Sequence, residues 1–259
     1  MTQPIDKSAP HSVVSREEWL AARKAHLKNE KALTRMRDLV SAERRALPWT
    51  KVERPYVFDT PDGKKTLAEL FDGRSQLVVY HFMWRWDIDS GCPSCSFLAD
   101  HFDGADFHLA HHDVSLVAIT RAPVATFAPY VKRLGWRFKW ASSYENDFNF
   151  DYRVSFTKDE LATGSIDYNY ETIDDPKYQW DELPGVSVFY KDGSGNVFHT
   201  YSSYSRGLDI LVGAYNFLDL TPKGRNETEI MDWVRRHDEY EDAPKSASCC
   251  GSAQGADAA

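Results

Sequence analysis

The stretch that decides the fold runs from Leu77 to Cys95 and reads LVVYHFMWRWDIDSGCPSC. Its first seven residues are apolar and rich in β-branched and aromatic side chains, which predicts a buried strand. A Cys-Pro-Ser-Cys motif follows at residues 92–95, and Phe97 and Leu98 begin a helical pattern behind it. Strand, loop, Cys-x-x-Cys and helix is the order in which this spacing indicates thiol redox chemistry.

The two cysteines are predicted to have different roles. A cysteine at the N-terminus of a helix faces unpaired backbone N–H groups and the positive end of the helix dipole, and both favour the thiolate. Pro93 suits the first helical position, where its missing N–H costs nothing. We therefore predict that Cys92 is the attacking thiolate and that Cys95, one turn on, is the resolving thiol. Two other interpretations stay open: a structural pair of buried cysteines and a metal clip.

Length and composition bound the class of protein. The chain has 259 residues, of which 42% are hydrophobic and 14% aromatic, enough for one large globular domain with or without an added arm. A net charge of −8 argues against nucleic acid or an anionic membrane as the main partner. We find neither a long apolar run nor a signal-peptide pattern, and four cysteines do not make a disulfide scaffold. We therefore expect a reducing, cytoplasmic location.

The pattern along the chain predicts four parts. We expect a disordered N-terminus over residues 1–14, a helical arm over 15–48, an α/β domain over 49–221 with an insertion or long loop at 157–183, and a charged segment with a flexible tail over 222–259. The arm opens with a Ser-x-x-Glu capping box at residues 15–18 and stops at Pro48. Its apolar stripe suits packing on the domain or on a second subunit, which would make a homodimer.

Further residues are candidates for binding or supporting a substrate. Two tryptophans in the loop before the cysteines would form a lid or a wall of the site. A histidine, two tyrosines and an arginine of a predicted hairpin should approach the cysteines, and the arginine would hold an anionic substrate or lower the Cys92 pKa. Ordinary aromatic packing is the alternative. With one arginine after the second core strand, the candidates are Trp84, Trp86, Arg121, His199, Tyr201, Tyr204 and Arg206.

A metal centre is the rival hypothesis. Two cysteines with one or more histidines would suit copper or zinc, and the candidate ligands are Cys92, Cys95, His81 and His199. The redox hypothesis requires no cofactor. In the tail, Cys249 and Cys250 form an incidental thiol pair, a soft-metal scavenger or a mobile dithiol that reaches Cys92.

The order of elements is that of a thioredoxin-like fold: strand, Cys-x-x-Cys helix, strand, helix, hairpin and closing helix. We therefore predict an α/β fold in which a central mixed sheet is flanked by helices, with a long N-terminal helical extension. Residues 59–73 resemble the first segment of peroxiredoxin-type domains. The chain is further similar to a bacterial thioredoxin-like family of unknown function, described as predicted dithiol–disulfide oxidoreductases. The segments that carry this resemblance are residues 78–83, 91–97, 121–123, 147–151, 199–207 and 218–222.

The resemblance implies a thioredoxin-like fold and a thiol or disulfide substrate, either a small molecule or a protein. Thioredoxins place a cis-proline immediately before the strand that faces the cysteines, and here Pro184 stands one residue early, followed by Gly185. Peroxiredoxins carry Thr and Pro just before the reactive cysteine, where this chain has Asp-Ser-Gly at residues 89–91. The leading hypothesis is a cytoplasmic thiol–disulfide oxidoreductase. The alternatives are a metal-binding protein or metalloenzyme, and a degenerate thioredoxin fold that acts only as an interaction module through its long N-terminal helix.

Overall fold

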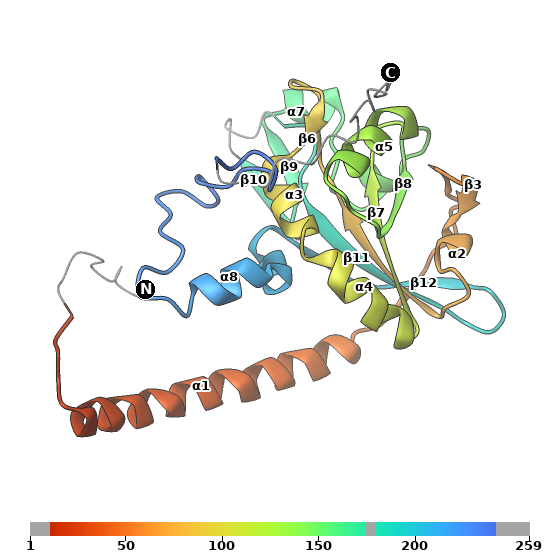
Figure 1. Cartoon of the computed structure of the whole chain (residues 1–259). Coiled ribbons are helices and arrows are strands. Elements are labelled where there is room, and N and C mark those ends of the chain that lie inside the picture. Colours follow the sequence, from red (N-terminus) through yellow and green to blue (C-terminus); the bar gives the residue numbers. More distant parts are fainter. Residues whose placement is uncertain (1–10, 175–179, 242–259) are drawn as a thin grey trace, which may run out of the picture.

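The computed structural model describes residues 11–174 and 180–241 and is built around a mixed β-sheet (Figure 1). The helices are α1 (Arg16–Arg45), α2 (Leu67–Leu70), α3 (Pro93–Ala99), α4 (Phe102–His111), α5 (Val124–Arg133), α6 (Phe148–Asp151), α7 (Lys158–Ala162), the 3-10 helix η1 (Ser205–Leu211) and α8 (Gly213–Leu218). The strands are β1 (Thr50–Lys51), β2 (Val57–Thr60), β3 (Gly63–Thr66), β4 (Gln76–His81), β5 (Trp84–Arg85), β6 (Ser90–Gly91), β7 (Val114–Thr120), β8 (Lys139–Ser142), β9 (Ser165–Tyr168), β10 (Glu171–Asp174), β11 (Gly185–Lys191) and β12 (Val197–Tyr204). The predicted disorder of residues 1–14 mainly concerns residues 1–10, which lie outside the described part, as do Cys249 and Cys250.

The main sheet has the strand order β1-β12-β11-β4-β7-β8-β2-β3. Strands β4 and β7 are parallel and are joined through α3 and α4, whereas β11 is antiparallel to both β4 and β12. A β-α-β unit is thus followed by a β-β-α unit that ends in α8, and the two units share one sheet. This is the thioredoxin-like arrangement, so the predicted fold class is confirmed.

Side chains of the central strand β4 alternate between two cores, one on each face of the sheet. Tyr80 packs in the core that also contains Cys92 and Cys95. Leu77 and Val79 pack in the other core, with Phe148. Because the period of a strand is two residues, His81 faces the same side as Val79 and points away from the cysteines.

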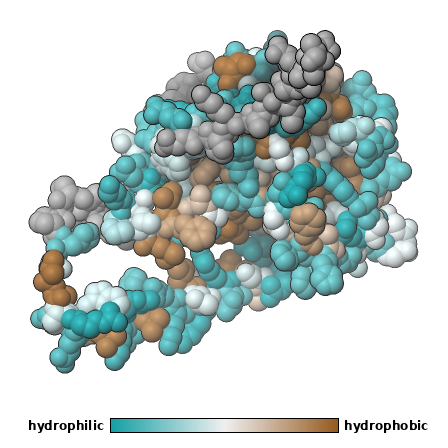
Figure 2. Space-filling model, in the orientation of Figure 1, coloured by the Kyte–Doolittle hydropathy of each residue, from teal (hydrophilic) through white to brown (hydrophobic). Residues whose placement is uncertain are grey.

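The N-terminal extension is a single helix, α1, of 30 residues. Ser15 and Glu18 form the predicted capping box, in which the Glu18 N–H donates to Ser15 Oγ and the Glu18 carboxylate accepts from the Ser15 N–H. None of its residues is buried. Figures 1 and 2 show it running beside the body with open space between them along much of its length. The predicted helical extension is therefore present, and its apolar side chains are exposed.

Two segments that the sequence pattern separated from the core are built into the body. Between residues 157 and 174, α7 and the β9–β10 hairpin add a small core that includes Phe156, Ile166 and Tyr204. After α8, Val234 and Arg236 are 4% and 8% exposed, so residues 222–241 do not simply trail away. The sequence did not predict this burial, because residues 222–241 are densely charged and show no apolar pattern. No helix among residues 11–174 and 180–241 is both long and apolar enough to cross a membrane.

Candidate active site

Cys92 is the N-cap of α3, and Pro93 occupies the first turn of that helix. The Cys92 N–H donates to the carbonyl oxygen of Met83 (3.2 Å), which ties the motif to the end of the central strand. Both cysteines are free thiols, and Cys92 and Cys95 are 6% and 3% exposed. The strand–loop–helix placement predicted for the motif is therefore the one observed.

The two sulfur atoms have opposite electrostatic environments. The Cys95 thiol, the N–H groups of Cys95 and Ser94, and the positive charge of Arg85 stabilise the Cys92 thiolate. They outweigh its burial and lower the Cys92 pKa to about 6. Burial in the core raises the Cys95 pKa well above its usual value, and the neighbouring Cys92 sulfur raises it further. These effects favour the thiolate at Cys92 and the protonated thiol at Cys95.

A cavity of about 320 Å³ lies over the cysteines. Its apolar walls come from β4 and α3, from η1 and the turn into α8, and from the segment after α8, through Tyr80, Leu98, Leu208, Val212, Met231 and Val234. Pro184, the residue before β11, also lines it, and every peptide bond in the described residues is trans. Because β11 begins at Gly185, Pro184 stands immediately before the strand and not one residue early, and it lies beside the cysteines with a trans peptide bond.

The loop before Cys92 is held by a buried cation. Arg236 donates to the carbonyl oxygen of Gly91 through Nη2 (2.7 Å) and Nε (3.2 Å), and Nε also donates to the Tyr130 hydroxyl (2.9 Å). A Cβ atom at Gly91 would stand 2.6 Å from the Tyr130 ring. Glycine is therefore required here for close packing. Arg236 was missed because no motif marks it and the segment that carries it is densely charged.

Glu182 gathers three of the predicted supporting residues. Its carboxylate accepts from the Trp84 N–H (3.1 Å) and the Trp86 Nε1–H (3.0 Å) and lies 3.7 Å from Arg121. Burial raises the pKa of Glu182 to about 7, although Arg121 and the two tryptophan donors act in the opposite direction. Trp84, Trp86 and Arg121 therefore brace the loop that leads to the cysteines, and none of them lines the cavity. Sequence reasoning missed Glu182, which lies in a segment without periodicity.

The predicted hairpin candidates do not reach the cysteines. Tyr201 lies under the guanidinium of Arg44 at the end of α1, 4.7 Å from ring centroid to Cζ. The Tyr204 hydroxyl donates to the carbonyl oxygen of Tyr152 (3.0 Å), and Arg206 forms an ion pair with Asp209 (3.2 Å). None of these side chains, nor His199, lines the cavity. Their expected approach to Cys92 is not observed.

His81 and His199 belong to a hydrogen-bonded chain on the opposite face of the sheet. His81 Nε2 lies 2.9 Å from Ser187 Oγ, which lies 2.8 Å from Ser202 Oγ, and His199 Nε2 lies 2.7 Å from the same Ser202 oxygen. Burial lowers the pKa of His81 to about 3. The expectation that His81 and His199 would complete a metal site with the cysteines is wrong, because strand alternation turns them away. Among the described residues no group of three or more His, Cys, Asp or Glu side chains could hold a metal ion.

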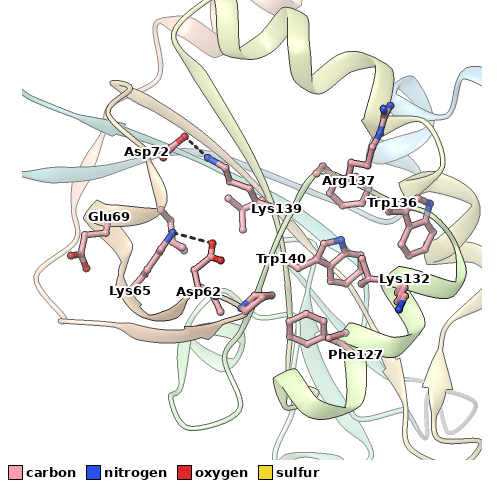
Figure 3. Close-up of a pocket in the computed structure, with 17 residues that line it drawn as sticks. Asp62, Lys65, Glu69, Asp72, Phe127, Lys132, Trp136, Arg137, Lys139 and Trp140 are labelled. Carbon is pink, nitrogen blue, oxygen red and sulfur yellow. Dashed lines mark hydrogen bonds and ion pairs between the residues drawn. The ribbon is translucent and has the colours of Figure 1, made fainter.

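A second cavity, of about 440 Å³, lies away from the cysteines beside β2, β3, α5 and β8 (Figure 3). Phe127, Trp136 and Trp140 form one wall, and the pairs Asp72–Lys139 and Asp62–Lys65 lie across from them. No cysteine or histidine lines this cavity. It therefore contains no group suited to thiol chemistry.

Comparison of folds finds similar chains among solved structures. Peroxidoxin BcpB from Mycobacterium tuberculosis is 14% identical, with a TM-score of 0.41, and the match covers 64% of this chain and 94% of that one. Peroxiredoxin Q from Xanthomonas campestris is 11% identical, with a TM-score of 0.42 and coverage of 66% and 96%. A chain provisionally described as the thiol:disulfide interchange protein DsbE from Chlorobium tepidum is 11% identical, with a TM-score of 0.37 and coverage of 64% and 99%.

No curated protein sequence matches the chain at a significant level. A family pattern, described as "Bacterial protein of unknown function (DUF899)", matches residues 8–240. This match includes the arm, the Cys-Pro-Ser-Cys motif, Glu182 and Arg236. The chain therefore belongs to the bacterial family of unknown function DUF899.

Proposed function

We propose that this protein is a thiol–disulfide oxidoreductase in which Cys92 is the nucleophile and Cys95 the resolving thiol. The observation that carries the proposal is the unequal environment of the two sulfurs: the Cys92 pKa is lowered to about 6 while the Cys95 pKa is raised. An attacking thiol reacts best when its pKa lies near the ambient pH, because it is then both ionised and nucleophilic. A purely structural pair of buried cysteines would not need this asymmetry.

The exchange proceeds in two steps. The Cys92 thiolate attacks one sulfur of a substrate disulfide. The substrate S–S bond breaks, the other substrate sulfur leaves as a thiolate, and a Cys92–substrate mixed disulfide remains. Cys95 then loses its proton to that leaving thiolate and attacks the Cys92 sulfur, which releases the second substrate sulfur as a thiolate and forms the Cys92–Cys95 disulfide. The substrate gains two electrons, and the protein dithiol loses two. A cellular dithiol would return the pair to the reduced form.

The chain's own residues support each step. Burial keeps Cys95 protonated until the mixed disulfide draws it into reaction. Arg85 adds positive charge next to the Cys92 thiolate, and Arg236 and Glu182 hold the loop from both sides. The exchange needs no metal or organic cofactor. We further propose a reducing, cytoplasmic location, in which the dithiol form would be the resting state.

The test uses a chain in which Cys249 and Cys250 are replaced by Ser, so that the remaining thiols are the active pair. Alkylation by iodoacetamide, located by peptide mass, is followed against pH. We expect Cys92 to be alkylated with a midpoint near pH 6. Cys92→Ser should abolish exchange, and Cys95→Ser should accumulate a mixed disulfide with a small disulfide. Ordinary titration of Cys92 near about 8.5, with Cys95 reacting faster, would reject the proposal.

A further inference from the structure

The cysteine cavity is partly open to solvent, but the two cysteines at its base are buried. Cys92 is only 6% exposed and Cys95 3%, so a disulfide must enter the cavity to meet the attacking sulfur. The cavity volume of about 320 Å³ lies within the range of sites that bury small organic ligands. The backbone around a disulfide on the surface of a folded protein would collide with the walls of this cavity.

The outer wall is anchored by buried contacts. It consists of residues 231–235, and the next residue, Arg236, is 8% exposed and bonds to Gly91 and Tyr130 beside the motif. Arg236 is also paired with Glu239 (2.7 Å). Swinging this wall away would leave a guanidinium and a carbonyl oxygen without their partners, which is costly inside a protein. The wall is therefore a fixed part of the site.

One cation at this cavity has no carboxylate partner among residues 11–174 and 180–241. Of the charged lining residues, Arg85 is bonded to Asp87 and Asp209 is paired with Arg225 (2.9 Å). The Asp232 carboxylate accepts two backbone N–H bonds, from Thr228 (3.0 Å) and Glu229 (3.2 Å). The Arg235 guanidinium donates only to the carbonyl oxygens of Val234 (2.9 Å) and Asp232 (3.5 Å) and forms no ion pair with the described residues. Its exposed guanidinium is thus available to an anion.

We infer that the substrate of the proposed exchange is a low-molecular-weight disulfide with an apolar chain and a carboxylate that pairs with Arg235, and that disulfides of folded proteins are excluded. The inference rests on the proposed function and names the substrate class of the same site. The apolar chain would lie along Leu208, Met231 and Val234. The sulfur next to it would then face Cys92, and the electrons would pass as in the exchange described above.

The experiment measures single-turnover oxidation of the reduced protein, with Cys249 and Cys250 replaced by Ser, by three disulfides. The first is dithiodibutyrate, the second is its neutral diamide, and the third is insulin. Each rate constant is divided by that of the same disulfide with a free small dithiol, which removes differences in intrinsic reactivity. Loss of the two free thiols is followed by mass. Arg235→Gln removes the charge, and Arg235→Lys keeps it.

We expect the normalised rate constant of dithiodibutyrate to exceed that of the diamide by about tenfold, the equivalent of one charge-assisted contact. Arg235→Gln should abolish this preference, and Arg235→Lys should keep part of it. Insulin should react about a hundredfold more slowly than dithiodibutyrate, since it cannot align with the buried sulfur. Equal normalised rates for all three would overturn the inference and leave the proposed function standing. Absence of reaction with all three would instead refute the proposed function.

Discussion

Arg236 donates two hydrogen bonds to the carbonyl oxygen of Gly91, the residue that precedes Cys92, although the two lie 145 positions apart in the chain. The contact joins the segment after α8 to the loop before α3. It makes the C-terminal part of the described chain a structural element of the candidate active site. Loss of this contact should therefore lower the free energy of unfolding and disturb the loop at Cys92.

Replacing Arg236 by Met should lower the free energy of unfolding by about 2 kcal/mol, the usual value for hydrogen bonds made by a charged group. Arg236→Lys keeps the charge but not the forked geometry, so it should recover only part of the loss. Urea unfolding of the reduced proteins measures the free energy of unfolding of both variants. Arg235→Met is the matched control, because Arg235 is exposed and its guanidinium donates only to nearby backbone carbonyl oxygens. Equal effects at the two positions would contradict the anchoring role.

The Cys95 side chain should control the ionisation of Cys92. Its thiol donates the hydrogen bond that contributes most to the low Cys92 pKa. Cys95→Ser keeps a donor at this position, whereas Cys95→Ala removes it. The pH midpoint for alkylation of Cys92 should stay near that of the wild type in Cys95→Ser and rise in Cys95→Ala. The same midpoint in both variants would show that the backbone N–H groups and Arg85 suffice.

Glu182 should make stability fall as pH rises. Its pKa is raised from 4.5 to about 7 in the folded chain, so between these values the native state binds a proton that the unfolded state has lost. Its contribution is fully present below pH 4.5 and is lost as pH rises towards 7, by up to about 1.4 kcal/mol per pH unit. His81 acts in the opposite direction, since its pKa is lowered from 6.5 to about 3. The difference between wild type and Glu182→Gln isolates the glutamate.

The measurement is urea unfolding of the wild type and Glu182→Gln at a series of pH values between 5 and 7.5. The stability of the wild type, relative to the variant, should decline across this range. A difference that does not change with pH would show that Glu182 stays ionised, held by Arg121 and the two tryptophan donors.

The arm should hold two copies of the chain together. Arg16–Arg45 carries nine basic and five acidic residues, and Trp19, Leu33, Met36 and Val40 are each at least 42% exposed. A soluble chain rarely leaves such a stripe uncovered. We expect the full chain to sediment as a dimer and a chain lacking residues 1–48 to sediment as a monomer. Identical masses and melting temperatures for the two would show that the arm is dispensable.

The sequence was most informative where local chemistry and periodicity agreed. The apolar run of β4, the proline after Cys92 and the capping box of α1 each act on neighbouring residues, so their structures could be predicted. The face of a strand is also a local property. The prediction that placed His81 near the cysteines is wrong, because His81 is close to them in sequence but strand alternation turns its side chain to the opposite face.

The partners of the cysteine loop could not be read in this way. Glu182 and Arg236 are 90 and 144 positions beyond Cys92 and reach it only through the order of strands and the packing after α8. A single charged residue in a polar segment has no pattern that marks it as buried. The same holds for Arg85, whose charge acts on Cys92 through space.

The chain of hydrogen bonds from His81 to His199 has a direction. His199 Nε2 also lies 3.1 Å from the carbonyl oxygen of Tyr201, which only accepts, so this nitrogen carries the hydrogen. Ser202 cannot donate to this nitrogen, so its hydroxyl is free to donate to Ser187, and Ser187 can in turn donate to His81 Nε2. In that arrangement His81 carries its hydrogen on Nδ1, a buried atom that interacts with the Asn149 side chain. The two histidines are consequently opposite tautomers, and a proton added to His81 would have to reverse every hydroxyl between them.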